Sequence, residues 1–93
     1  MRVIIRFSLN NDQGSALRNT LKPILESGGI LWTGANTGTY EGEDIAESDL
    51  RNVLARFWST LHGYMGNAHL DHFWMYVDKK RGDEAEDEDQ END

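Results

Sequence analysis

The stretch HFWMYVDKK, residues 72–80, has the alternation of a β-strand. With a period of two it has two sides, one formed by Phe73, Met75 and Val77 and the other by His72, Trp74 and Tyr76. A strand that lies on a core needs only one apolar side. The aromatic residues on the second side therefore indicate a contact surface in addition to the core.

A second strand is predicted near the N-terminus by RVIIRFSL, residues 2–9, which is rich in β-branched residues and alternates in the same way. Its apolar side consists of Val3, Ile5, Phe7 and Leu9, and its other side of Arg2, Ile4, Arg6 and Ser8. Each of these two strands has one continuous apolar side, which indicates a sheet that is covered on one face.

A helix and a hairpin are predicted after the first strand. Apolar residues at helical spacing predict the helix over residues 13–27, and Gly28 and Gly29 would end it. Two short β-prone runs, residues 30–33 and 37–40, then flank GANTG, residues 34–38, which reads as a hairpin turn.

The most regular helix follows this hairpin. Asp44 and Glu47 resemble a capping box at its start. Its apolar stripe is formed by Leu50, Val53, Leu54, Phe57 and Leu61, and Trp58 widens it. The glycines of HGYMGN, residues 62–67, would end this helix, and the last strand would cover residues 69–78.

The predicted order is β–α–β–β–α–β, which is the order of the ferredoxin-like, or split βαβ, fold. We therefore expect an α+β domain over residues 1–81, with a four-stranded antiparallel sheet and two helices on one face. Residues 82–93 contain a long run of acidic residues without apolar ones, so we expect a disordered acidic tail.

The uncovered face of this sheet is the predicted binding surface. It would carry Arg2, Ile4, Arg6, His72, Trp74 and Tyr76. An aromatic patch of this kind indicates a partner surface. We favour a homodimer formed through the sheets, or binding of another protein. The alternative is single-stranded RNA, with the arginines on phosphates and the aromatic residues stacked on bases.

The charge distribution favours a protein partner over nucleic acid. The chain has 93 residues and a net charge of −8. Residues 1–82 contain nine Lys and Arg and nine Asp and Glu, whereas residues 83–93 contain eight Asp and Glu and no Lys or Arg. Binding of a polyanion depends on positive charge, which a neutral domain next to an acidic tail does not supply.

No motif in the sequence requires a metal, a cofactor or a catalytic nucleophile, and we expect a non-enzymatic protein. HLDH, residues 69–72, has zinc-binding residue types, but on a strand its two histidines point to opposite sides. The acidic residues Glu41, Glu43, Asp44, Glu47 and Asp49 could hold magnesium. The last three lie at the start of a helix, where capping and the helix dipole already explain them. TGANTG, residues 33–38, lacks the lysine of a phosphate-binding loop.

Localisation is predicted only in broad terms. The chain has no cysteine, no apolar stretch long enough to span a membrane, and no pattern of a signal sequence at its first residues. We therefore expect a cytoplasmic protein.

The layout of the chain resembles the VapD-type and CRISPR-associated small ribonuclease group. The resemblance rests on MRVIIRFSLNND, a helix, a hairpin ending in TYEGED, a long second helix, and LDHFWMYVDKK. It implies a ferredoxin-like dimer joined through the sheets and, as an alternative function, metal-dependent cleavage of RNA. In that case Asp12 would be the acidic residue after the first strand, with Ser8 and Tyr40 as neighbours.

Overall fold

The structure, a computed structural model, describes residues 1–34 and 38–78. The predicted acidic tail, residues 82–93, and the middle of the predicted hairpin turn, residues 35–37, lie outside the described residues. The elements in chain order are β1 (Arg2–Asn10), the short 3₁₀ turn η1 (Gln13–Ser15), α1 (Ala16–Ser27), β2 (Leu31–Trp32), β3 (Thr39–Gly42), α2 (Glu47–Gly63) and β4 (His69–Asp78).

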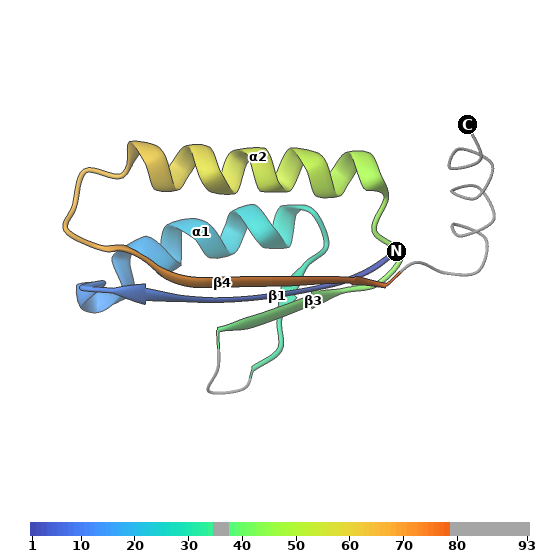
Figure 1. Ribbon diagram of the computed structural model, residues 1–93, viewed down its shortest axis with the longest axis horizontal. Coiled ribbons are helices and arrows are strands. Elements are labelled where there is room, and N and C mark those ends of the chain that lie inside the picture. The colour runs from blue at the N-terminus through green and yellow to red at the C-terminus, as the bar shows by residue number, and fades with distance from the viewer. Residues whose placement is uncertain (35–37, 79–93) are drawn as a thin grey trace.

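The fold is the predicted ferredoxin-like α+β arrangement. The four strands form one antiparallel sheet in the order β2-β3-β1-β4, so β3 lies between β2 and β1 as in a split βαβ unit. Both helices cover one face of this sheet, and within residues 1–34 and 38–78 no helix covers the other (Figure 1). We call the uncovered side the open face.

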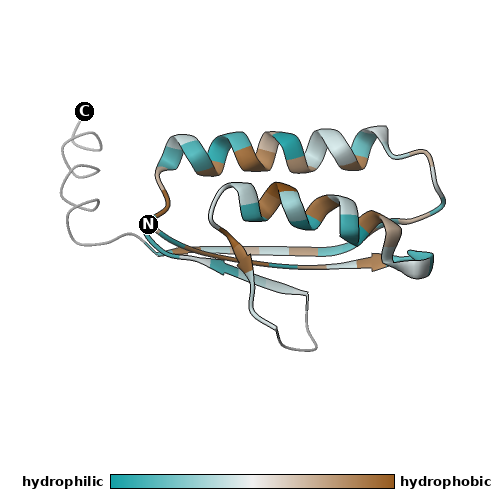
Figure 2. Ribbon diagram, turned by 180° about the vertical axis from the view of Figure 1, so that it is seen from behind, coloured by the Kyte–Doolittle hydropathy of each residue, from teal (hydrophilic) through white to brown (hydrophobic). Residues whose placement is uncertain are grey.

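β1 is a central strand, and its position determines the core. Val3, Ile5 and Phe7 are buried beneath the helices. Ile5 lies opposite Tyr40 of β3 and Met75 of β4. Hydrophobic and hydrophilic residues alternate along the helices as well, and this pattern leaves one apolar side of each helix for the core (Figure 2).

α1 begins after a tight turn that reverses the chain at the end of β1. Asn11, Gly14 and Ser15 have positive φ angles of 60°, 65° and 57°. The carboxylate of Asp12 accepts hydrogen bonds from the backbone N–H groups of Leu17 and Arg18 at 2.7 and 3.0 Å. Asp12 therefore satisfies donors that the first turn of a helix leaves without a partner.

The start of α2 differs from the prediction. The helix begins at Glu47 with Ala46 at its N-cap, a residue that makes no side-chain capping hydrogen bond. Asp44 has a φ of 57°, so the chain turns there before the helix starts. The predicted capping box of Asp44 and Glu47 is therefore wrong.

The apolar stripe of α2 divides into a buried and a partly exposed row. Leu50, Val53 and Phe57 are buried, whereas Leu54 and Leu61 are only partly buried. The two helices contact each other closely, because a Cβ added to Gly28 would collide with the Val53 side chain.

β4 lies at an edge of the sheet and pairs only with β1 among the described strands. The pairing shifts between Ser8 and Leu9, which lie opposite His72 and Leu70, so Asp71 is the extra residue of a β-bulge. Met75, which the sequence analysis placed on the core side, is 37% exposed, because α2 does not extend over the outer edge of β4. Among the described residues, no helix is long and apolar enough to cross a membrane.

Candidate functional site

The open face brings the six predicted surface residues together in cross-strand pairs. Arg6 of β1 lies opposite Trp74 of β4, and Ile4 lies opposite Tyr76. The end pairs are Arg2 with Asp78 and Ser8 with His72. The antiparallel pairing of β1 with β4 alone produces this arrangement, since opposed residues point to the same face.

The β4 side of the open face carries a stacked aromatic pair. Trp74 and Tyr76 have ring centroids 6.2 Å apart and an interplanar angle of 8°. They are 48% and 44% exposed. The guanidinium of Arg6 lies 5.3 Å from the centroid of the Trp74 ring, and its Nε donates to Oγ1 of Thr39 at 3.3 Å. The pair therefore forms an accessible aromatic cluster with a cation at one side.

Arg2 is largely neutralised by acids that the sequence analysis did not place on this face. Its guanidinium lies 2.8 Å from the Glu41 carboxylate and 3.3 Å from that of Glu43. The hydrogen bond to Glu41 and the charge of that residue raise the pKa of Arg2 above its usual value. Arg2 consequently contributes little net positive charge to the open face.

Glu41 and Leu31 extend the open face toward its far edge. Glu41 lies opposite Ile4 on β1 and opposite Leu31 on β2, and Leu31 is exposed. Neither residue was predicted to lie on this face, because the register of the hairpin determines which side of β3 faces the helices. That register is indicated only weakly in a stretch so rich in Gly and Thr.

His72 lies at the end of the open face in a small polar network around Asp71. The Asp71 carboxylate lies 3.0 Å from Nδ1 of His72 and accepts hydrogen bonds of 3.3 Å from Ser8 and Asn10. The hydrogen bond with His72 is the main reason why the pKa of Asp71 is below its usual value. The network keeps His72 beside Trp74 at the rim of a shallow hollow.

This hollow has a volume of about 390 Å³. Its lining is formed by Arg6, Phe7, Ser8, Gly38, His72 and Trp74. Arg6, His72 and Trp74 place a cation, an imidazole and an aromatic ring at its walls, which are groups that can bind a polar or aromatic side chain. The exposed imidazole and guanidinium are donors for a carbonyl or carboxylate group.

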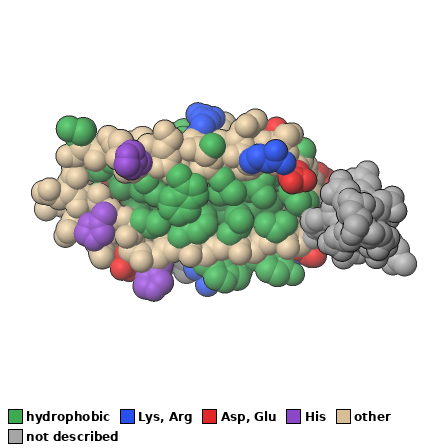
Figure 3. Space-filling view, turned by 45° about the horizontal axis from the view of Figure 1, so that its top comes forward, with side chains coloured by type: hydrophobic (Ala, Val, Ile, Leu, Met, Phe, Trp, Pro, Cys, Tyr) green, Lys and Arg blue, Asp and Glu red, His purple; other side chains and the backbone are tan. Residues whose placement is uncertain are grey.

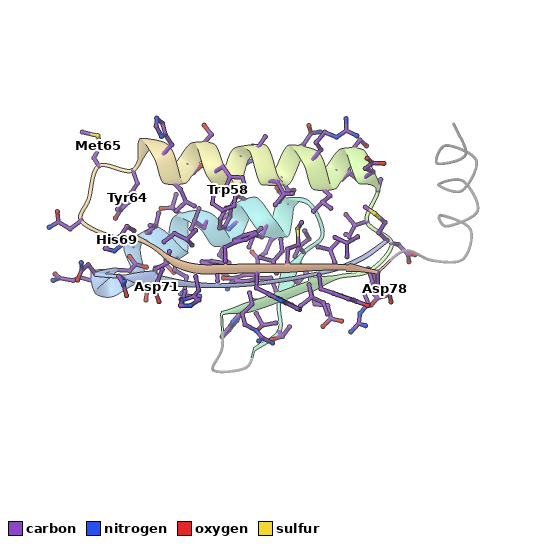
Figure 4. The ribbon with its side chains drawn as sticks, viewed as in Figure 1. Trp58, Tyr64, Met65, His69, Asp71 and Asp78 are labelled. Carbon is purple, nitrogen blue, oxygen red and sulfur yellow. The ribbon has the colours of Figure 1, made fainter. Side chains whose placement is uncertain are left out.

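The helix side of β4 carries a second exposed apolar surface, which the sequence analysis did not predict. Figure 3 shows a continuous band of hydrophobic side chains on the face that carries α2 and β4. Trp58 extends from α2 toward β4 (Figure 4), where its ring centroid lies 4.8 Å from that of Phe73. Trp58 is nevertheless 42% exposed. We call Trp58, Phe73, Met75 and Val77 the α2–β4 band.

The metal-binding residue types of HLDH do not converge. Nδ1 of His69 lies 3.3 Å from the carbonyl oxygen of Asn67, whereas Asp71 interacts with His72. Within residues 1–34 and 38–78, no group of three or more His, Cys, Asp or Glu residues is arranged to hold a metal ion.

The three residues implied by the ribonuclease resemblance lie in different environments. Asp12 caps α1, and the hydroxyl of Ser8 donates to Asp71 on the open face. Tyr40 is buried on the helix side, where it stacks on Phe7 with centroids 5.5 Å apart, and burial raises the pKa of its hydroxyl. The structure therefore does not bring these three side chains together.

Comparison with known proteins adds no further assignment. No family model matches the chain, and neither does a curated protein or a solved structure.

Proposed function

We propose that this protein is a small non-enzymatic protein-binding module that acts as a homodimer, with the Trp74–Tyr76 pair in its contact surface. The observation that carries the proposal is the stacking of two half-exposed aromatic rings on a sheet face that neither α1 nor α2 covers. Exposed apolar patches of this kind mark interaction sites in proteins.

The residue types around the pair support a protein partner. Trp, Tyr and Arg dominate the binding energy of protein interfaces, and Arg6 lies directly over Trp74. Polar groups surround the aromatic centre, with Glu41 on one side and His72 on the other. An apolar centre with a polar rim is the usual composition of a protein–protein interface.

The electrostatics of the face argue against a phosphate backbone as its main ligand. Among the residues that the structure describes, Glu41 and Glu43 neutralise Arg2, and Arg6 is then the cation beside the aromatic pair. Residues 1–82 carry equal numbers of basic and acidic residues. A nucleic-acid surface needs several uncompensated cations, since counterion release supplies most of its affinity.

Light scattering on matched tryptophan variants tests the proposal. Trp74→Glu places a charge in the contact surface, whereas Trp32→Glu makes the same change at a similarly exposed residue of β2. We expect Trp74→Glu to raise the dimer dissociation constant at least about 30-fold, as for an interface hot spot. Trp32→Glu should leave it unchanged. A wild-type protein that stays monomeric, or equal effects of the two variants, would refute the proposal.

A further inference from the structure

The direction of the backbone N–H and C=O groups determines which residues of β4 can bond to a further strand at its outer edge. This direction follows from the hydrogen bonds of β1. The N–H of Phe7 donates to the carbonyl oxygen of Gly38, next to β3, at 3.1 Å. Backbone groups of successive residues in an antiparallel strand point to opposite neighbours. Odd-numbered residues of β1 therefore point toward β3, and the even-numbered residues Ile4 and Arg6 point toward β4.

The same alternation continues in β4. Trp74 and Tyr76 lie opposite Arg6 and Ile4, so their backbone groups bond to β1. The intervening residues, Phe73, Met75 and Val77, direct their N–H and C=O groups to the outer edge. Among the described residues, no strand lies along that edge.

From His72 to Val77, this edge lacks the features that usually prevent pairing with another strand. Residues 72–78 contain no Pro, Lys or Arg. The β-bulge at Asp71 ends the regular ladder just before His72. Edge strands of monomeric proteins are normally protected by bulges, prolines or charged residues, most often Lys. The regular segment His72–Asp78 is thus open to strand addition.

We propose that β4 pairs antiparallel with β4 of a second copy, about a two-fold axis at Met75. The inference rests on the proposed function, because it assumes the homodimer and specifies how its two chains meet. Met75 is the middle residue of the regular segment His72–Asp78. A two-fold axis there lets the whole segment pair with itself, and it joins the two sheets into one.

This register is self-complementary on both faces. On the open face it places Trp74 opposite Tyr76 of the second copy and His72 opposite Asp78 of the second copy. On the helix side it places Phe73 opposite Val77 of the second copy. Aromatic pairs and pairs of a cationic or hydrogen-bonding group with a carboxylate stabilise antiparallel strands.

The neighbouring register, with its axis at Trp74, is less favourable. It would place Asp71 opposite Val77 of the second copy and Leu70 opposite Asp78 of the second copy. A carboxylate against an apolar side chain at an interface loses hydration without gaining a partner. The register with its axis at Met75 avoids both mismatches.

The α2–β4 band gives the contact its apolar area. A two-fold axis perpendicular to the joined sheet places both α2 helices on the same side of it. Met75, the most exposed aliphatic side chain of β4, would contact Met75 of the second copy, and Phe73 and Val77 flank it. The contact between the two β4 strands would thus cover the outer side of the Trp74–Tyr76 pair on the open face and of the α2–β4 band on the helix side. Ile4, at the centre of the open face, would stay uncovered.

Three lysine variants distinguish this contact from a dimer formed face to face. Met75→Lys places two like charges opposite each other at the edge. Ile4→Lys puts the same charge at the centre of the open face, next to Glu41, and Met65→Lys puts it on a side chain that is 95% exposed. We expect Met75→Lys to raise the dissociation constant at least about 30-fold, as for a hot spot, while the other two stay dimeric.

A cysteine variant tests the register itself. The chain has no cysteine, so Met75→Cys introduces a unique thiol. Opposed residues of a hydrogen-bonded antiparallel pair have Cα atoms about 5.5 Å apart, within the range that a disulfide spans. Mild oxidation should link the two chains of Met75→Cys, and Met65→Cys should stay unlinked.

The possible results separate this inference from the proposed function. If the Ile4→Lys protein is monomeric and the Met75→Lys protein is still a dimer, the edge contact is refuted. The homodimer of the proposed function would then stand. A Met75→Cys dimer that does not become linked would likewise refute the register. A wild-type protein that is monomeric would refute both proposals.

Discussion

Trp58 of α2 and Phe73 of β4 lie with their ring centroids 4.8 Å apart, and this contact attaches the second helix to the edge strand. The ring centroid of Phe73 also lies 5.5 Å from that of Phe57, a residue that is completely buried. The aromatic contacts thus run from the core out to a half-exposed tryptophan. Trp58 thus packs over the core beside β4 and also forms part of the exposed α2–β4 band.

Replacement of Trp58 by alanine should therefore destabilise the fold. We expect Trp58→Ala to lower the free energy of unfolding by about 2 kcal/mol, less than for a fully buried tryptophan because the side chain is partly exposed. Trp32→Ala, at a similarly exposed ring that contacts Lys22, should cost less. Urea denaturation followed by circular dichroism measures both values, and equal losses would contradict the role of Trp58.

Asp12 is expected to contribute to stability through its capping of α1. Asp12→Ala removes the acceptor for the N–H groups of Leu17 and Arg18 and should lower the free energy of unfolding by about 1 kcal/mol. Asp12→Asn retains an acceptor oxygen and should lose less. Urea denaturation again gives the values. If the alanine and wild-type proteins unfold at the same urea concentration, the capping role is wrong.

Gly42 occupies a position where the chain leaves no room for a side chain. A Cβ at this residue would lie 2.5 Å from the carbonyl oxygen of Gly29 and 2.9 Å from the Ile45 side chain. We expect Gly42→Ala to cost about 2 kcal/mol of stability through overpacking. Gly63→Ala is the control, since nothing lies within 4 Å of its Cβ position. A thermal midpoint equally lowered in both variants would argue against a specific clash.

The Asp71 carboxyl should titrate at a lower pH than an ordinary aspartate, because His72 donates to it. A carboxyl with a lower pKa in the folded chain contributes stability above its unfolded pKa. That contribution disappears as the pH falls through the lowered folded pKa. Carbon-detected NMR titration should show the pKa of Asp71 rising in His72→Leu and rising less in Ser8→Ala. An unchanged pKa in His72→Leu would rule out this cause.

β1 and β4 and the two sides of each could be predicted from the sequence because alternation is a local property. The prediction for β3 was wrong at its end, since the strand reaches Gly42 and was expected to end at Tyr40. The limits of β4 and the side on which Ile4, Arg6, Trp74 and Tyr76 lie follow from the period of two alone. The pairing of β1 with β4 then follows from the order of the elements.

The features that the sequence analysis missed depend on packing between distant elements. Met75 is exposed because of where α2 lies over the sheet, and no local pattern determines that position. Glu41 reaches the open face through the register of a short hairpin. The capping box failed because Asp44 is used in a turn with positive φ, although the residue types matched the pattern.

The most direct test of the account is the mass of the wild-type protein in solution. Sedimentation equilibrium over a wide range of protein concentrations measures it without any substitution. The account predicts a particle of twice the 10.6 kDa chain mass, which dissociates only on dilution. A mass of 10.6 kDa at every concentration would contradict it, because the exposed surfaces on both sides of β4 would then have no second copy to cover them.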